Sequence, residues 1–353
     1  MGTTWYKPGT LMAVMALSTQ LLPAHGRNTT AVRADIERDG GEIRIQAVVL
    51  DLLEVGNVNL ADWNRLEWDS RKALLRECGM SMSRRFGLLT EEAGLLYPES
   101  VRVEVPDLEE GRQRSMTIDQ QIIGICLRYD FACPPSGLIF AQEFRGGQPG
   151  ESIPAQLLVY QSGELVLLPA QFGPGLPLLH RFNWQAPPAD ISKMSSLDGV
   201  VPDWRHRPAS LRLVRDGSGL LARAYLPLNG VQVAGAAAAP ELLSSLAPWL
   251  GAMIRLRSGP VETDLSGAEY HRYPYSVLAV EHQEALPGET SDSGLLVLEK
   301  AIPEIDPVMP MEALLGPESG PLALLLVVEE NENEVTFSLL NTIRPDLARS
   351  SDK

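Results

Sequence analysis

Two serines stand in glycine-containing stretches that superficially resemble the settings of catalytic nucleophiles. Ser218 lies in Asp216-Gly-Ser-Gly219, and Ser293 precedes Gly294. Neither stretch is a Gly-x-Ser-x-Gly elbow, and neither is expected at the strand-to-helix turn that such a serine requires. Gly-Ser-Gly between two apolar runs is typical of a hairpin loop. We therefore interpret Ser218 as a turn residue.

The histidines are dispersed, and no two have the spacing of a metal-binding pair. They are His25, His180, His206, His271 and His282. His206 follows Asp203-Trp-Arg in a polar, aromatic stretch that can contact a ligand, although a surface or packing role is the simpler interpretation. An approach of His271 and His282 across a hairpin stays open. No catalytic metal is predicted.

Nucleotide and calcium sites are not predicted either. The chain lacks the phosphate-cradling Gly-x-x-x-x-Gly-Lys motif and the dinucleotide fingerprint at a strand-to-helix junction. The acidic run 329–334 lacks the spaced ligands and the glycine of a calcium loop, so a solvated hairpin tip is the interpretation. Asp51, Glu54 and Glu104 are expected on solvated strand faces. We therefore predict no catalytic, cofactor-binding or metal-binding residue.

Three cysteines are too few for a disulfide scaffold, and they lack the paired spacing of a zinc site. In an oxidising compartment Cys126 and Cys133 can bridge neighbouring extended segments, and free buried thiols are the alternative. Cys78 is expected to be unpaired in both cases.

Composition places the chain among globular proteins. Hydrophobic residues make up 44% of its 353 residues and charged residues 21%. This length favours two domains of roughly 150 residues each. The net charge of −15 and the lack of a basic stripe disfavour a nucleic-acid partner. The same charge disfavours anionic membranes, so membrane contact is expected to be peripheral at most.

Residues 1–24 have the pattern of an export signal. Lys7 precedes an apolar stretch, and Ala24 can precede a cleavage point, although Leu22 is larger than the residue usually preferred there. The stretch is interrupted at 18–20 and is shorter than the roughly 20 apolar residues that span a membrane. A buried first helix is the alternative. We predict an exported protein, periplasmic or in the outer envelope.

Alternating apolar and polar residues predict strands in the first half of the chain. They cover 41–55, 97–105, 122–131 and 153–169. A hairpin turn is expected at Gln161-Ser-Gly163, between the two strands of the last stretch. A helix is expected from Asn59 to Cys78, with Gly79 as its stop.

The second half of the chain shows a similar order of elements. The expected elements are a strand, turn and strand at 211–225, a helix at 237–256 and a strand at 335–340. Tyr273-Pro-Tyr-Ser-Val277 repeats the pattern of Tyr97-Pro-Glu-Ser-Val101 at a fixed offset in numbering (273 − 97 = 176). Because each pentad follows a helix and precedes a Gly/Pro-rich stretch and a hairpin, a duplicated unit is indicated.

These elements predict an α+β fold. It is expected to be a tandem duplication of a mainly antiparallel β-sheet unit, with one packed helix in each copy. The expected parts are a signal peptide at 1–24, a first repeat unit at 30–170, a Pro/Gly-rich linker at 171–207, a second repeat unit at 208–345 and a polar tail at 346–353. A ligand-binding loop between the units is the alternative interpretation of the linker.

Two stretches resemble the C-terminal β region of bacterial secretins and their envelope relatives. They are Ile43-Arg-Ile-Gln-Ala-Val-Val-Leu-Asp-Leu-Leu-Glu-Val55 and Ile153-Pro-Ala-Gln-Leu-Leu-Val-Tyr-Gln-Ser-Gly-Glu-Leu-Val-Leu-Leu168. In that family a long strand opens the region, and a strand, glycine turn and strand occur near its end. The glycine-rich stretches and long membrane-spanning strands of a secretin pore are not recognisable here. The resemblance implies an envelope-located structural or assembly protein, without catalytic residues.

The leading prediction is therefore an exported, non-enzymatic structural or protein-interaction component of the bacterial cell envelope. Envelope proteins or further copies of the chain are its expected partners. The alternative is a secreted hydrolase with a site between the units, for which His206, Asp203 and Ser218 are the candidates. A hydrolase would gather titratable groups with perturbed pKa values in one pocket, whereas an interaction protein would show an exposed sheet edge or an apolar patch.

Overall fold

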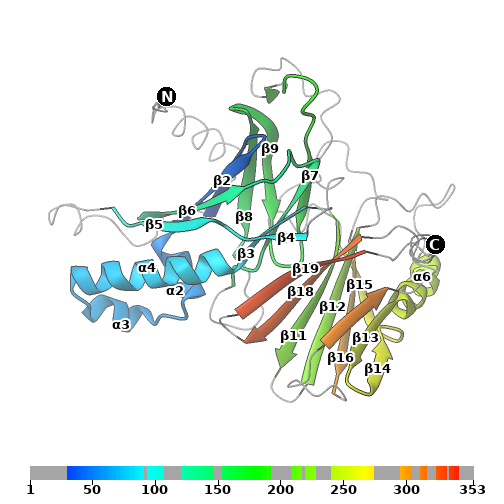
Figure 1. Ribbon diagram of the computed structural model, residues 1–353. Coiled ribbons are helices and arrows are strands. Elements are labelled where there is room, and N and C mark those ends of the chain that lie inside the picture. The colour runs from blue at the N-terminus through cyan, green and yellow to red at the C-terminus, as the bar shows by residue number, and fades with distance from the viewer. Residues whose placement is uncertain are drawn as a thin grey trace.

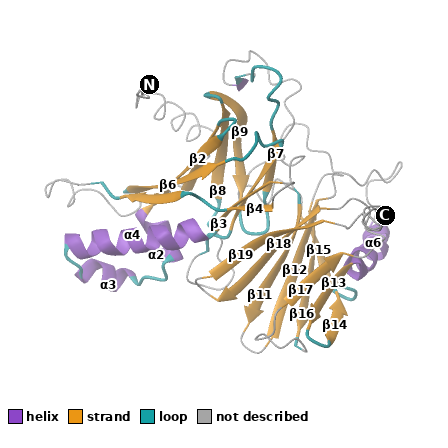
Figure 2. Cartoon of the chain, in the orientation of Figure 1, coloured by secondary structure: helices purple, strands orange, loops and turns teal. Residues whose placement is uncertain are grey.

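The structure, a computed structural model, describes residues 30–90, 94–106, 121–145, 153–188, 190–191, 208–216, 219–227, 240–273, 295–303, 311–315, 323–331 and 334–341. These residues form a mixed α+β protein dominated by strands, in two halves that lie against each other (Figures 1 and 2). The expected α+β class is confirmed. The predicted signal peptide and polar tail lie outside the described residues.

The first half is built on a six-stranded sheet, called here the first large sheet. In spatial order its strands are β5 (Ser100–Glu104), β6 (Ile122–Asp130), β2 (Gly40–Val48), β1 (Thr30–Ile36), β8 (Ala155–Gln161) and β9 (Glu164–Phe172). Its neighbouring strands are antiparallel except β1 and β8, which are parallel. The first small sheet contains β10 (Leu178–Arg181), β7 (Gly137–Gln142), β3 (Phe86–Thr90) and β4 (Gly94–Leu96).

The second half has the same strand order. Its large sheet contains β15 (Glu269–Tyr273), β16 (Leu295–Ile302), β12 (Gly219–Pro227), β11 (Ala209–Asp216), β18 (Ala323–Asn331) and β19 (Glu334–Asn341). Here β11 and β18 are the parallel pair. Its small sheet contains β14 (Val261–Asp264), β13 (Ile254–Ser258) and β17 (Met311–Leu315).

The opening hairpins of the two halves also agree in register. Arg33 of β1 lies opposite Arg44 of β2, and Arg212 of β11 lies opposite Arg223 of β12. The offset in numbering is the same for both strands (212 − 33 = 179 and 223 − 44 = 179). The two pairs of arginines therefore occupy matching places in the two sheets.

The Tyr-Pro pentads do not mark matching places. Cys126 and Glu299 correspond to each other, because they lie opposite the matching Arg44 and Arg223. Their partners on the edge strands are Arg102 of β5 and Glu269 of β15, which differ in number by 269 − 102 = 167 and not by the 176 of the pentads. The first pentad begins before β5, whereas the second begins at the last residue of β15 and continues outside the described residues. The register of the opening hairpins is the better guide to the correspondence between the halves.

The described helices are α2 (Val49–Val55), α3 (Leu60–Arg65), α4 (Trp68–Arg84) and α6 (Pro240–Met253). The strand expected over 41–55 ends at Val48, because Leu52, Leu53 and Val55 are buried on one side of a short helix. The helix expected from Asn59 is divided into α3 and α4. Gly79 does not end α4 but lets it approach β5, since an added Cβ would lie 2.7 Å from a Val103 methyl.

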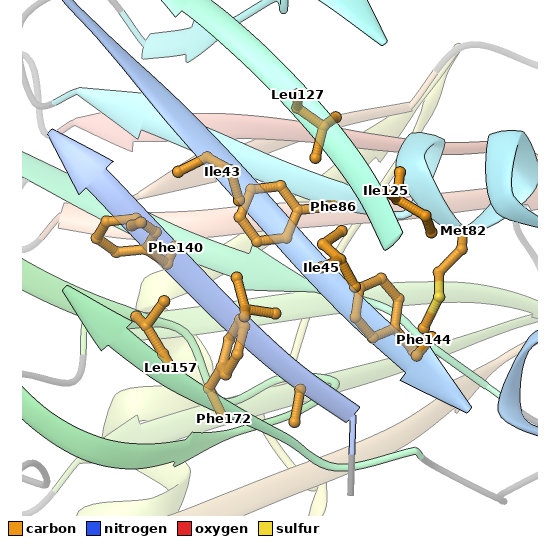
Figure 3. Close-up of a cluster of buried hydrophobic side chains, with 14 of the residues drawn as sticks. Ile43, Ile45, Met82, Phe86, Ile125, Leu127, Phe140, Phe144, Leu157 and Phe172 are labelled. Atoms are coloured by element: carbon orange, nitrogen blue, oxygen red, sulfur yellow. The ribbon is translucent and has the colours of Figure 1, made fainter. Parts of the chain in front are cut away.

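The first core lies between the two sheets of the first half and is closed by the helices. Figure 3 shows part of it, where aliphatic residues of the large sheet meet aromatic residues from β3, β7, β9 and the segment after β7. The labelled members are Ile43, Ile45, Met82, Phe86, Ile125, Leu127, Phe140, Phe144, Leu157 and Phe172. The predicted hairpin turn is confirmed, with Ser162 and Gly163 at φ of 50° and 85°.

The two central strands of the first small sheet, β3 and β7, are buried on both faces. Along β7, Leu138 and Phe140 point into the first core, whereas Ile139 and Ala141 point toward the second half. The side chains that point toward the second half form an apolar contact with it, called here the joint cluster. It consists of Leu89, Ile139, Ala141, Leu325, Val327 and Phe337. The two halves are therefore stacked face to face, with the first small sheet between the two large ones.

The stretch 171–207 begins as part of the first half. β9 continues to Phe172, and β10 pairs with β7. The indole N–H of Trp184 donates a hydrogen bond to Pro135 O over 2.7 Å, and the Trp184 ring stacks on Phe182 with 5.6 Å between centroids. Described linker residues up to 188 thus close the end of the first core, and 192–207 lie outside the described residues.

Candidate functional site

A buried ion pair joins the two halves. Glu143 follows β7 in the first half, and Arg212 lies in the middle of β11 in the second. The distance from Glu143 Oε2 to Arg212 Nη2 is 2.8 Å, and the two side chains are 3% and 5% exposed. A charge buried without its partner costs several kcal/mol, roughly 3 to 5 when one member of such a pair is removed. Each residue therefore depends on the other half of the chain.

Strand alternation places both members of the pair. Glu143 continues the face of β7 that carries the joint cluster, and its N–H donates to Arg85 O over 2.8 Å. On β11, Ser210 and Arg212 face the first half, because the residues between and beside them point into the second core. The ion pair between Glu143 and Arg212 thus lies at the edge of the apolar joint cluster, on the same contact between the halves.

A glycine turn from the first half completes the joint. Gly175 N donates to Glu143 Oε1 over 3.2 Å, and Ser210 Oγ donates to Gly175 O over 2.7 Å. Gly175 has φ of +75°, and an added Cβ would collide with the Tyr225 ring. Only glycine satisfies both the conformation and the contact. Arg145 Nη2 lies 3.5 Å from Glu143 Oε2 at the border of the site.

The electrostatics keep Arg212 charged. Burial lowers the pKa of Arg212, but the Glu143 carboxylate and the Tyr225 hydroxyl raise it by more, so its pKa lies above the ordinary value. Arg212 Nη1 is 3.5 Å from Tyr225 Oη. The guanidinium is therefore a permanent cation that needs the carboxylate beside it. This arrangement can hold two β structures together, and both charged side chains are closed to solvent.

The matching arginines of the first half are partly exposed. Arg33 pairs with Asp35 at 2.7 Å, and its side chain is 19% exposed. Its guanidinium also lies 4.1 Å from the centre of the Tyr160 ring. Arg44, the partner of Arg33 in register, has a side chain that is 38% exposed. The outer face of the first large sheet therefore carries two partly exposed arginines. On the second large sheet Arg212 is covered by the first half and is 5% exposed, whereas Arg223, which matches Arg44, is 33% exposed.

The cysteines are free. Cys126 lies on β6 in register with Arg44 and Arg102, and Cys133 is exposed, so the alternative of two buried thiols holds for Cys126 but not for Cys133. Burial and Glu104 raise the pKa of Cys126, and this outweighs the opposite effect of the two arginines. Burial also raises the pKa of the Cys78 thiol to about 11. Both thiols are therefore protonated at neutral pH.

The structure does not describe the residues considered for a hydrolase. Ser218, Ser293, His206 and Asp203 lie outside the described residues, as do His25 and His282. His180 of β10 packs edge to face on Phe182, with 4.8 Å between ring centroids. His271 is exposed on β15, opposite Val297.

The carboxylates of the first half have structural surroundings. Asp51 and Glu54 lie on α2 rather than on a strand, and Asp51 Oδ2 accepts a hydrogen bond from Thr30 Oγ1 at 2.5 Å. Glu104 stands on the outer face of β5 and pairs with Arg102 at 2.7 Å, as the alternation predicts. In the part of the chain that the structure describes, no three His, Cys, Asp or Glu side chains are grouped to hold a metal ion.

Sequence reasoning missed Glu143, Arg212 and Gly175. Glu143 and Arg212 are far apart along the chain and meet only because the halves stack. The signals available in the sequence were a charged residue directly after the apolar strand β7, for Glu143, and a charged residue between Leu211 and Leu213, for Arg212.

Comparison of the chain with protein-family models and with curated proteins found no match. Among the helices that the structure describes, none combines the length and apolar character needed to cross a membrane. A functional proposal therefore rests on the joint and on the surfaces around it.

Proposed function

We propose that this protein is a non-enzymatic structural or protein-interaction component of the bacterial cell envelope, built from two copies of one β-rich unit. Two features support the duplication. The two large sheets have the same strand order, and their opening hairpins share one register at a single offset in numbering. Arginines occupy matching places in both hairpins, although the surrounding side chains differ.

The closed joint is the observation that carries the structural role. The titratable groups buried between the halves, Glu143 and Arg212, are paired with each other and are 3% and 5% exposed. The carboxylate also accepts a hydrogen bond from Gly175. Catalytic groups must reach a substrate, whereas these groups hold one half of the protein on the other. A rigid two-unit body that presents charged outer faces suits a structural or adaptor role.

The proposed location rests on the export pattern of residues 1–24 and on the resemblance to the secretin β region. One part of that resemblance, the hairpin at 153–168, corresponds to β8 and β9. The other, the long strand at 43–55, is a strand only to Val48. We propose a secretin-like envelope protein on this basis, with envelope proteins or other copies of the chain as partners.

Hydrolysis assays test the non-enzymatic role. The purified protein and a His206→Ala variant are incubated with chromogenic esters, glycosides and peptides. We expect no turnover above buffer from either protein. A turnover by the unchanged protein that His206→Ala abolishes would contradict the proposal and establish the hydrolase.

Localisation is tested separately with a C-terminal epitope tag on the full chain. Cell fractionation is expected to recover the tag in the periplasmic or outer-envelope fraction, on a protein that has lost its first residues. A cytosolic protein that retains residues 1–24 would disprove export.

A further inference from the structure

We draw no further inference here: the strongest candidate, the outer face of the first large sheet where Arg33, Arg44 and Arg102 lie in one row across the strands with Cys126, has each arginine paired with a carboxylate of its own strand, and nothing in the part of the chain that the structure describes shows what covers that face.

Discussion

The two large sheets have the same strand order and carry arginines in the same places on their outer faces, yet Arg33 on the first is 19% exposed, whereas Arg212 on the second is 5% exposed beneath the other half. On the first, Arg33 pairs with Asp35 two positions along its own strand. On the second, Arg212 pairs with Glu143 of the other half. An arginine therefore pairs with a carboxylate of its own strand in the first sheet, whereas an arginine at the matching place of the second sheet attaches the other half. The residues around each arginine decide which.

The neighbours of the covered face are apolar. Across the second large sheet, Arg212 is in register with Val327, which is in register with Phe337. Val327 and Phe337 form the joint cluster with Leu89 and Ile139 of the first small sheet. An apolar surface of this kind excludes water from the ion pair, which strengthens the pairing and makes its loss costly.

The two small sheets show the complementary difference. Leu89 lies opposite Ile139 in the first, on the face that meets the second half. The corresponding pair in the second is Arg257 opposite Glu312, on a face where Arg257 is exposed. The stack is thus apolar at its joint and charged at both ends, as in repeat proteins whose terminal units are polar outside. This pattern favours a stack of two units over a longer array.

Replacement of the buried arginine should have the largest effect. Arg212→Met leaves the Glu143 carboxylate buried without its main partner, so we expect a loss of about 3 to 5 kcal/mol in the free energy of unfolding. Arg33→Met, at the matching open place, should cost less than about 1 kcal/mol. Urea titration of both variants measures the difference. Equal losses would show that the two faces are not distinguished by burial.

Crowding the joint should have a smaller effect. In Gly87→Ala the new Cβ would lie 2.8 Å from the Phe337 ring, so the halves must shift apart. We expect a loss of about 1 to 3 kcal/mol in stability, the usual cost of overpacking. The matching residue of the second small sheet is the exposed Arg255, and Arg255→Ala should change stability by less than about 0.5 kcal/mol. An unchanged urea midpoint for Gly87→Ala would mean that the halves do not touch there.

Alkaline pH should weaken the first half selectively, with the smallest effect. All cysteines belong to it, and burial raises the pKa of Cys78 from 9.0 to about 11. Because the folded state holds the proton more tightly, this contribution to stability is complete below pH 9 and is lost between pH 9 and 11. Two pKa units correspond to about 2.7 kcal/mol in total, of which about 1.4 is lost by pH 10.

Urea titrations at pH 8 and pH 10 measure this loss, and Cys78→Ala removes the thiol. Burial also raises the pKa of Tyr129, which adds a loss of the same sign at higher pH. Identical pH dependence with and without the thiol would contradict the assignment to Cys78.

The strands that face water on one side were predictable from the sequence. Val101 and Val103 of β5 alternate with charged residues. The β8–β9 hairpin was predictable from its turn at Gln161-Ser-Gly163, and the β11–β12 hairpin from its glycine-containing turn between apolar runs. The strands β3 and β7 gave no alternation, because they are buried on both faces by the stacking of the halves. The run 48–55 presents an apolar face both as a strand and as a helix. The expected strand over 41–55 was therefore drawn too long, and helix α2 was missed. Tertiary stacking, which the sequence pattern does not encode locally, explains both errors.

A double-mutant cycle on Glu143→Gln and Arg212→Met tests most directly the claim that a buried ion pair joins the halves. The two residues should be coupled by about 1 kcal/mol or more, within the range of about 0.5 to 3 kcal/mol found for residues in contact. The cycle Asp35→Asn with Arg33→Met should give less than about 1 kcal/mol and a smaller value than the joint. Additivity of Glu143→Gln and Arg212→Met within about 0.5 kcal/mol would contradict the joint described here.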